Sequence, residues 1–433
     1  MTTRNETTTA MLKNKNERGA LLPVLAIGMF AMVAVAGLAI DSSHAFVNVT
    51  RVQNALDAAA LSAATALHNH GKDTSIANTQ GTSTFSQHLN GEMATSGVSV
   101  SFQYSATLNP FVPGGADPNF VRAVADNHTI GMWFSRLLPG VGNTWTIGST
   151  AVSGPIPLLG GQVCDIAPLL VCGDPADTDA SDGTIGGLPI GTGAAQCLKF
   201  GAGTNAGNGN GNGNGNGNGN GNGNNNNGGG GNNNQPAACG TQPIDDPNGV
   251  GPGNYHLLNL GGTGGSVIRQ NLAGGFQGCL SLLDSATIDT APGNKVGPVR
   301  QGLNTRFGEY QGGGVSPAAF PPDLVTTSPQ THSQYTTAYA NENYTNAGEE
   351  FRRIITVPIA DCAGIQNGQS TVPVFALGCY FLRQRIAQGG QESFVIGELI
   401  DECNANGTPG DTTPALGGPF EIILFNDPGN PAT

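Results

Sequence analysis

The feature that most constrains this sequence is an apolar run of 21 residues from Ala20 to Ile40, which contains no charged side chain. As an α-helix the run spans roughly 30 Å, which is about the thickness of the hydrocarbon core of a bilayer. A buried core helix is the alternative, but such helices rarely remain apolar on all faces over this length. The run is also longer than the apolar region of a cleaved secretory signal. It therefore predicts a retained transmembrane helix over residues 20–40.

The charges on either side of this run predict its orientation. Arg51 is the only basic residue among the twenty that follow the run, whereas four basic residues precede it: Arg4, Lys13, Lys15 and Arg18. Lys and Arg next to a membrane span favour the cytoplasmic side. Residues 1–19 are therefore predicted to be a cytoplasmic tail, and residues 41–433 are predicted to lie across the membrane.

The composition argues against two classes of function. The net charge is −13, and the residues after position 20 include 13 basic and 28 acidic side chains. Binding to a phosphate backbone requires clustered Lys and Arg, so nucleic acid is not an expected partner. Only 11% of the residues are charged and 67 are Gly, which is typical of a loop-rich extracytoplasmic protein rather than a cytosolic enzyme.

A helical pattern continues beyond the apolar run. Six apolar residues recur at alternating spacings of three and four, the spacing of a helix-packing seam: Val49, Val52, Leu56, Ala59, Ala63 and Ala66. Helix-ending residues follow at 68–71. We therefore expect a helical extension over residues 41–70, so that a single helix of about 70 Å includes both the span and this extension.

Specific residues in this part of the chain match a known family pattern. Arg18 and Gly19 precede the apolar run, Pro23 lies within it, Asp41 follows it, and RVQNALDAAALSAA occupies residues 51–64. Over about residues 17–67 the chain thus resembles the TadE/TadG-like proteins of the tight-adherence (Flp) pilus assembly system. The resemblance implies a bacterial inner-membrane protein with a periplasmic body that acts in pilus assembly or surface adhesion. Its implied partners are the membrane and other pilus assembly or envelope proteins.

Two departures from related proteins leave other functions open. Pilin-type precursors carry Glu five residues after the cleaved Gly, but here Val24 stands at that distance from Gly19. The Asp-x-Ser-x-Ser metal motif of some longer family members is absent, so we predict no metal site. The alternatives are a minor pilin-like fibre subunit and a membrane-tethered periplasmic enzyme with a site in residues 240–433.

Three polar residues of the family-like segment, Gln53, Asn54 and Asp57, are the candidate partner-docking residues. They could equally form the solvated polar face of a long helix. Neither interpretation gives them a catalytic role.

The rest of the chain predicts an α+β fold in three parts. Residues 71–160 suit a small membrane-proximal α+β domain, with strands at 97–106, 120–125 and 146–152 and a helix at 130–138. Residues 161–239 form a Cys-containing loop whose Gly/Asn tract at 207–234 cannot build a core and suits a spacer. Residues 240–433 suit a β-rich, disulfide-bonded C-terminal domain, with a helix near 267–272 and strands at 354–359, 374–382, 394–400 and 420–425.

The cysteines predict disulfides rather than a zinc site. All eight follow the apolar run, and no C-x-x-C spacing occurs: Cys164, Cys172, Cys197, Cys239, Cys279, Cys362, Cys379 and Cys403. An even number suits up to four disulfides among 105 possible pairings. We expect Cys164 with Cys172, because a short loop closes readily, and Cys197 with Cys239, because they flank the Gly/Asn tract.

No motif identifies an enzyme or a cofactor. The sequence lacks H-E-x-x-H, G-x-S-x-G, a phosphate-binding loop, and G-x-G-x-x-G after a strand. The acidic run at 174–183 resembles a calcium loop but has Asp182 at the required Gly position, so a solvated turn is favoured. His68 and His70 are expected to cap a helix or be exposed. We therefore predict a non-enzymatic interaction protein with no catalytic residue, cofactor, metal or identified small-molecule substrate.

Overall fold

The computed structural model describes most of the chain after the N-terminal tail: residues 21–137, 142–158, 161–178, 182–200, 255–281, 286–363, 365, 368–387, 394–409 and 418–428. The predicted cytoplasmic tail, the Gly/Asn tract and Cys239 lie outside these residues. Within them the fold is α+β with a β-rich C-terminal region, as the sequence predicts.

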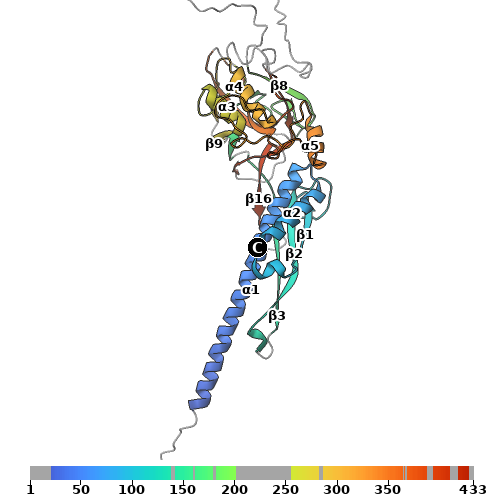
Figure 1. Ribbon diagram of the computed structural model, residues 1–433, viewed down its shortest axis with the longest axis vertical. Helices are drawn as coiled ribbons and strands as arrows, with labels where there is room; N and C mark the ends of the chain where they lie inside the picture. The colour runs from blue at the N-terminus through green and yellow to red at the C-terminus, as the bar shows by residue number, and fades with distance from the viewer. Residues whose placement is uncertain are drawn as a thin grey trace, which may run out of the picture.

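One continuous helix, α1 (Leu21–Asn69), runs from the apolar segment into the body of the protein. Pro23 falls in its first turn, where the missing N–H costs no helical hydrogen bond. The N-terminal third projects free, and the rest of the helix packs against a sheet, the β2–β3 connection and a second helix (Figure 1). By length and composition α1 can cross a membrane. The predicted joining of span and extension in one helix is confirmed.

A short turn ends α1 and begins the helix α2 (Thr74–His88). Gly71 has a φ of +63°, a left-handed conformation that favours glycine. Asp73 then caps α2 by accepting hydrogen bonds from the backbone N–H groups of Ser75 and Ile76 at 2.8 and 3.2 Å. Because Gly81 has no Cβ, α2 approaches α1 closely: an added Cβ would lie 3.0 Å from the Cβ of Ala63.

The membrane-proximal sheet lies beside the C-terminal half of α1 (Figure 1). Its strands have the order β1-β2-β3-β16-β14, and β14 pairs parallel with β16 while the other pairs are antiparallel. The elements are η1 (Gly91–Thr95), β1 (Val100–Ser105), β2 (Phe120–Gly131), η2 (Ser135–Leu137), β3 (Thr144–Pro157), β14 (Glu402–Asn404) and β16 (Gly418–Phe425). The predicted strand at 420–425 therefore exists, but it pairs with β3 in this sheet rather than with the other C-terminal strands.

The distal region contains a second, six-stranded sheet of β5-β11-β12-β13-β8, with β10 paired to β12. Its strands are β5 (Val171–Cys172), β8 (Ala195–Lys199), β10 (Thr287–Asp289), β11 (Ile354–Ala360), β12 (Thr371–Leu382) and β13 (Phe394–Ile400). The smaller sheets contain β4 (Gln162–Ile166), β6 (Thr184–Ile185), β7 (Leu188–Pro189), β9 (Phe276–Ser281) and β15 (Gly407–Thr408). The helices are α3 (Gly265–Gly274), α4 (Val296–Leu303), η4 (Asn304–Phe307) and α5 (His332–Ala340).

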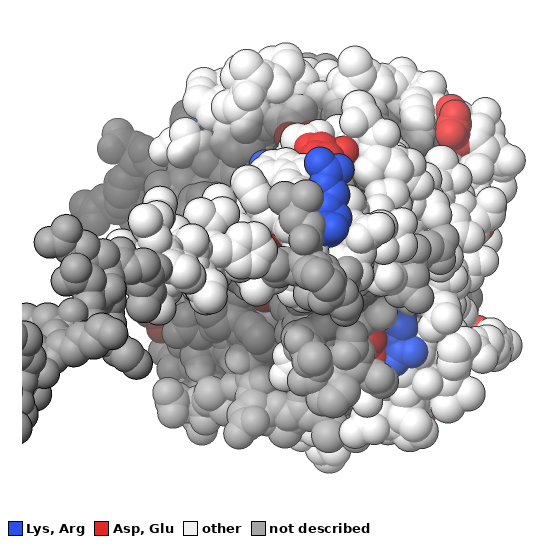
Figure 2. Space-filling view, turned by 90° about the horizontal axis from the view of Figure 1, so that it is seen from below, with Lys and Arg blue, Asp and Glu red and all other residues white. Residues whose placement is uncertain are grey.

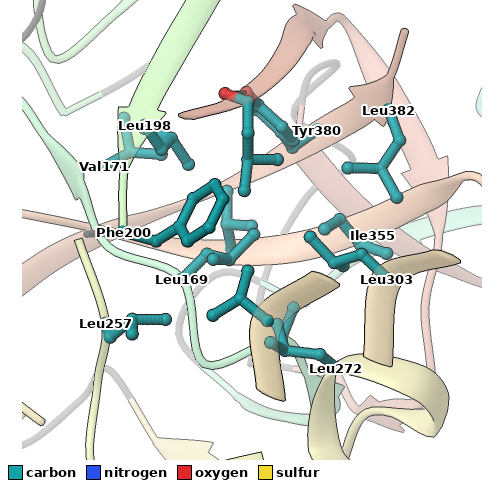
Figure 3. Packing of buried hydrophobic residues seen from close by; sticks show 14 of the residues in the cluster. Leu169, Val171, Leu198, Phe200, Leu257, Leu272, Leu303, Ile355, Tyr380 and Leu382 are labelled. Atoms are coloured by element: carbon teal, nitrogen blue, oxygen red, sulfur yellow. Dashed lines mark hydrogen bonds between the residues drawn. The ribbon is translucent and has the colours of Figure 1, made fainter. Parts of the chain in front are cut away.

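The main core of the distal region lies between this sheet and the helices α3 and α4 (Figure 3). Leu272 and Leu303 from the helices meet Ile355 and Leu382 from the strands, and all four are at most 4% exposed. Phe200, which follows β8, fills the centre of the cluster and is fully buried. The predicted helix at 267–272 and the predicted strands at 354–359, 374–382 and 394–400 are confirmed.

The predicted helix at 130–138 is wrong in the described residues. Ile130 continues β2 and pairs with Trp145 of β3, so this segment is the end of a β-hairpin. The backbone N–H groups of Trp133, Phe134 and Ser135 bond to the carboxylate of Asp41 instead of to helical carbonyls. Among the described residues of this segment, helical structure is confined to the short 3₁₀ helix η2 (Ser135–Leu137).

Three disulfides join the described cysteines: Cys164–Cys279, Cys172–Cys362 and Cys379–Cys403. The predicted Cys164–Cys172 bond is wrong, because strand register places Cys164 opposite Cys279 in the β4–β9 pair. Cys197 is disulfide-bonded as well. Its predicted bond to Cys239 lies outside the described residues and stays a prediction.

Candidate interaction site along helix α1

The predicted packing seam of α1 is buried in the membrane-proximal region. Val52, Leu56, Ala59 and Ala63 are each at most 2% exposed, and Val49 packs against the same core. The small Ala side chains bring the helix close to the sheet and to α2. The seam therefore serves the internal packing of this chain.

Of the three predicted docking residues, Gln53 bonds to the sheet and Asp57 bonds to Gln53. The Gln53 side-chain amide donates hydrogen bonds to the Asp57 carboxylate at 2.7 Å and to the Thr150 carbonyl of β3 at 3.2 Å. The Ser149 hydroxyl donates to the Gln53 side-chain oxygen. Burial raises the pKa of Asp57, although the hydrogen bond from Gln53 opposes this. Gln53 thus joins α1 to β3, and Asp57 holds the Gln53 side chain in place.

Asn54, the third predicted docking residue, is exposed and continues a strip along the outer face of α1. Phe46 is 73% exposed and Val47 is 42% exposed, and Thr50 is exposed between them and Asn54. Thr50 follows Phe46 by four residues and Val47 by three, and Asn54 follows Thr50 by four, so their side chains form a strip along one side of the helix. We call Phe46, Val47, Thr50 and Asn54 the outer strip.

Asp41 is the first residue after the apolar run, and it holds the β2–β3 hairpin against the helix. Its side chain is 2% exposed and accepts hydrogen bonds from the backbone N–H groups of Trp133 at 2.9 Å, Phe134 at 3.0 Å and Ser135. Burial raises the pKa of this carboxyl group, but these hydrogen bonds outweigh burial and the net shift is downward. Asp41 therefore acts as a charged cap for η2.

An ionic cluster joins the C-terminal end of α1 to β14. No motif in the sequence predicts this cluster. Glu402 lies 2.6 Å from Nζ of Lys72 and 3.2 Å from Nδ1 of His68. Nε2 of His68 donates to the carbonyl of Asn119 at 3.0 Å. Burial opposes ionisation of Glu402, but His68 and Lys72 outweigh it and hold its pKa at about 2. His68, expected to be a cap or exposed, has a fully buried side chain.

His70, the residue that follows α1, meets the distal region. The ring of His70 packs edge-on against Phe351 and Tyr339, with centroids 5.6 and 6.2 Å apart. Burial lowers the pKa of His70, which suits an uncharged ring among aromatic groups. The end of α1 therefore contacts the membrane-proximal sheet through His68, and His70 contacts the distal region.

A cluster of shifted titratable groups lies next to this contact, in the region where an enzyme site was an alternative. Asp323 accepts hydrogen bonds from the hydroxyls of Tyr335 at 2.6 Å and Tyr339 at 2.9 Å, and from the backbone N–H groups of Val325 and Arg353. Burial raises its pKa, although these bonds oppose the shift. Both carboxylate oxygens of Asp323 thus accept hydrogen bonds from donors within the protein.

Arg353 completes this cluster and is fully buried. Its guanidinium donates to the carbonyls of Leu382, Val325, Thr327 and Arg383 and to the side chain of Gln330, over 2.8–3.1 Å. Burial lowers its pKa to about 10. The donors have internal acceptors, so the arrangement explains the pKa shifts as structural ones.

The acidic turn considered as a calcium loop is held by hydrogen bonds within the chain. Oδ2 of Asp177 accepts from the Gly187 N–H at 2.7 Å and from the Thr184 hydroxyl at 2.9 Å. Asp179 and Ser181 lie outside the described residues. In the part of the chain that the structure describes, no group of three His, Cys, Asp or Glu side chains could hold a metal ion.

In comparisons with known proteins, the helical segment matches a family model. No curated protein and no solved structure matches the chain at a significant level. Residues 19–66 match the model of the family described as "Putative Flp pilus-assembly TadE/G-like". The matched residues comprise most of α1, including Asp41, the three predicted docking residues and the outer strip. The resemblance predicted for residues 17–67 is confirmed over this segment, which links the chain to Flp pilus assembly.

Proposed function

We propose that this chain is a non-enzymatic component of Flp pilus assembly or surface adhesion, anchored in the bacterial inner membrane with its body in the periplasm. The observation that carries the proposal is the continuity of α1. The helix that can cross the membrane is also the element to which the proximal sheet and the distal region attach. The body is thus presented to partners at a fixed distance from the bilayer.

Two further features support the periplasmic placement of the body. Disulfides persist in oxidising compartments, and three join the described cysteines. The basic residues before the apolar run favour a cytoplasmic N-terminus.

The structural use of Asp323 and Arg353 supports an interaction protein over the membrane-tethered enzyme, because their shifted pKa values arise from internal packing.

The partner-docking face in this proposal is the outer strip, with Asn54 as its polar end. Gln53 and Asp57 support the strip indirectly, because their bonds to each other and to β3 fix the rotation of α1 about its axis. Exposed apolar side chains followed by polar ones along one helix face suit another pilus assembly protein that is itself held at the membrane.

Site-specific photo-crosslinking in cells that assemble pili tests this proposal. A photoreactive residue at Asn54 should form a covalent product with another pilus assembly protein. The matched control is Asn341, an exposed asparagine that follows α5 in the distal region. The absence of any product from Asn54, or the same product from both positions, contradicts the proposed docking face.

The fibre-subunit alternative is separated by the mass of the mature N-terminus. The proposal predicts a chain that keeps the residues before Gly19. A chain cut after Gly19 and recovered in purified fibres would replace the assembly role with that of a minor pilin-like subunit.

A further inference from the structure

The end of the β2–β3 hairpin carries an unusual concentration of exposed aromatic side chains. The chain has only two tryptophans, and both lie here: Trp133 is 53% exposed and Trp145 is 49% exposed. Phe134, beside Trp133, is 39% exposed. We call Trp133, Phe134, Arg136 and Trp145 the hairpin tip. Large exposed apolar side chains that gather in one place mark a surface that contacts another molecule or a membrane.

Contacts with α1 place the hairpin tip at the outer end of the apolar run. Phe134 packs on Gly37, where an added Cβ would lie 2.7 Å from the Phe134 Cβ. The Trp133 ring stacks on His44 with centroids 4.4 Å apart. With a rise of about 1.5 Å per residue, these contacts lie about 6 Å before and about 4.5 Å beyond Asp41 along the helix. The hairpin tip therefore straddles the level at which α1 leaves the hydrocarbon core.

The charge around the hairpin tip differs from that of the whole chain. No Asp or Glu occurs between Asp126 and Asp165, although the net charge of the chain is −13. Arg136 is the one Lys or Arg in that stretch, and it is exposed. Seen from the end at which the free N-terminal third of α1 projects, most of the described surface is neither acidic nor basic (Figure 2). Glu92, whose side chain is 49% exposed, lies next to the hairpin tip, where it is paired with His44 at 2.6 Å. The hairpin itself adds no acidic side chain that would oppose the approach of a bilayer with anionic headgroups.

We propose that the hairpin tip is a second membrane anchor, which inserts the Trp133 and Trp145 rings into the interfacial layer of the leaflet from which α1 emerges. Tryptophan suits this layer because its ring is apolar and its N–H is a hydrogen-bond donor. The Arg136 guanidinium is placed to bind lipid phosphate, a ligand that matches its geometry.

The consequence is a fixed tilt of the body relative to the membrane. A single transmembrane helix leaves the body free to rotate about the helix axis and to lean. A second contact, bonded to the helix through Asp41, removes part of this freedom. The inference requires that α1 spans a membrane, and it is independent of the role in pilus assembly.

Tryptophan fluorescence tests the proposal, because every tryptophan of the chain belongs to the hairpin tip. The full chain is reconstituted into vesicles of phosphatidylcholine and phosphatidylglycerol that carry a nitroxide at a shallow or a deep acyl position. We expect blue-shifted emission, weak quenching by aqueous acrylamide, and stronger quenching by the shallow nitroxide than by the deep one. The variants Trp133→Phe and Trp145→Phe should each retain this pattern, since both rings lie in the same layer.

A control tryptophan reports on the distal region. Tyr344, 43% exposed, contacts Tyr339 at a centroid distance of 5.7 Å, near the end of α1 at His70. That end is about 45 Å beyond Asp41 along the helix. Tyr344→Trp in a background of Trp133→Phe and Trp145→Phe should be quenched severalfold more by acrylamide than the native tryptophans, and not by either nitroxide.

Three outcomes overturn the proposal, provided that circular dichroism shows a folded protein. One is acrylamide quenching of the native tryptophans as strong as that of the control. Another is protection from acrylamide that disappears as the lipid-to-protein ratio rises, which identifies a second copy as the occupant. The third is stronger quenching by the deep nitroxide. Flotation of the protein with the vesicles reports separately on the insertion of α1.

Discussion

The membrane-proximal and distal regions are stabilised in different ways. The proximal sheet packs on one long helix through small side chains such as Ala55, Ala59 and Ala60, all fully buried. The distal region has no comparable helix among its described elements, and it instead combines short helices, disulfides and the buried Arg353. A membrane helix can thus serve as the scaffold of the domain next to it, while a domain farther away needs its own stabilising contacts.

The two regions meet at β14, a strand of three residues. Glu402 binds His68 and Lys72 at the end of α1, and the neighbouring Cys403 is bonded to Cys379 of the distal sheet. One short strand therefore joins helix, proximal sheet and distal sheet. If this comparison is correct, a substitution in one region should leave the other intact, whereas a change at β14 should affect their coupling.

The largest effect is expected in the distal region, from Arg353→Leu. The substitution leaves several buried carbonyl groups without a donor, and such losses cost about 3–5 kcal/mol of unfolding free energy. The matched control is Arg385→Leu, because the Arg385 side chain is 47% exposed and forms one ion pair with Glu309; it should cost less than about 1 kcal/mol. Urea unfolding of both variants provides the measurement. Equal losses would show that the buried cluster contributes no more than a surface ion pair.

The contact between β14 and the end of α1, which Glu402 makes, should lose stability in acid. The pKa of Glu402 is about 2 against an ordinary value of 4.5, so its ionised form stabilises the folded state above about pH 4.5. This stabilisation, on the order of 3 kcal/mol, is lost as the pH falls from 4.5 towards 2. Urea unfolding at pH 6 and pH 3 should show a smaller difference in Glu402→Gln than in the wild type. An identical pH dependence of the two proteins would contradict the role of Glu402 at the junction.

The smallest effect is expected in the proximal region, from Asp41→Asn. Both carboxylate oxygens accept backbone N–H groups, so the amide of Asn must direct an NH₂ at one of these donors. We expect a local loss of about 1–3 kcal/mol, seen as faster hydrogen exchange at Trp133, Phe134 and Ser135. Asp73→Asn is the control, because one oxygen accepts both capping bonds and Asn caps helices equally well. Unchanged exchange in Asp41→Asn would mean that the hairpin is held by packing alone.

The elements that have a local signal in the sequence could be predicted from it. The apolar run and the seam that follows it predict α1, and the strand at 394–400 has the predicted bounds because β-branched and apolar residues there are flanked by polar and Gly-rich segments. The end of the β2–β3 hairpin has no such local signal, because Asp41, 92 residues before Trp133, supplies the bonds that decide its conformation. Asp41 directly follows the apolar run, and a buried carboxylate in that place needs hydrogen-bond donors. Its position in the sequence could therefore have indicated a partner segment elsewhere in the chain.

Long-range pairing could not be predicted from local patterns. Cys164 was expected to bond to Cys172 across a short loop, but its actual partner lies 115 residues away, where strand register places it. Gln53 and Asp57 could be recognised as a polar pair on the helix, but the bond from Gln53 to β3 could not be predicted. His68 gave no sign of its contact with Glu402, which is 334 residues farther along the chain.

We propose that one helix both crosses the inner membrane and supports an exported body. Protease added to intact spheroplasts tests it most directly, with an antibody against the C-terminal region and a cytoplasmic protein as the control for lysis. The account predicts digestion of the C-terminal region while the cytoplasmic control stays intact. A C-terminal region that remains protected until the inner membrane is lysed would contradict it.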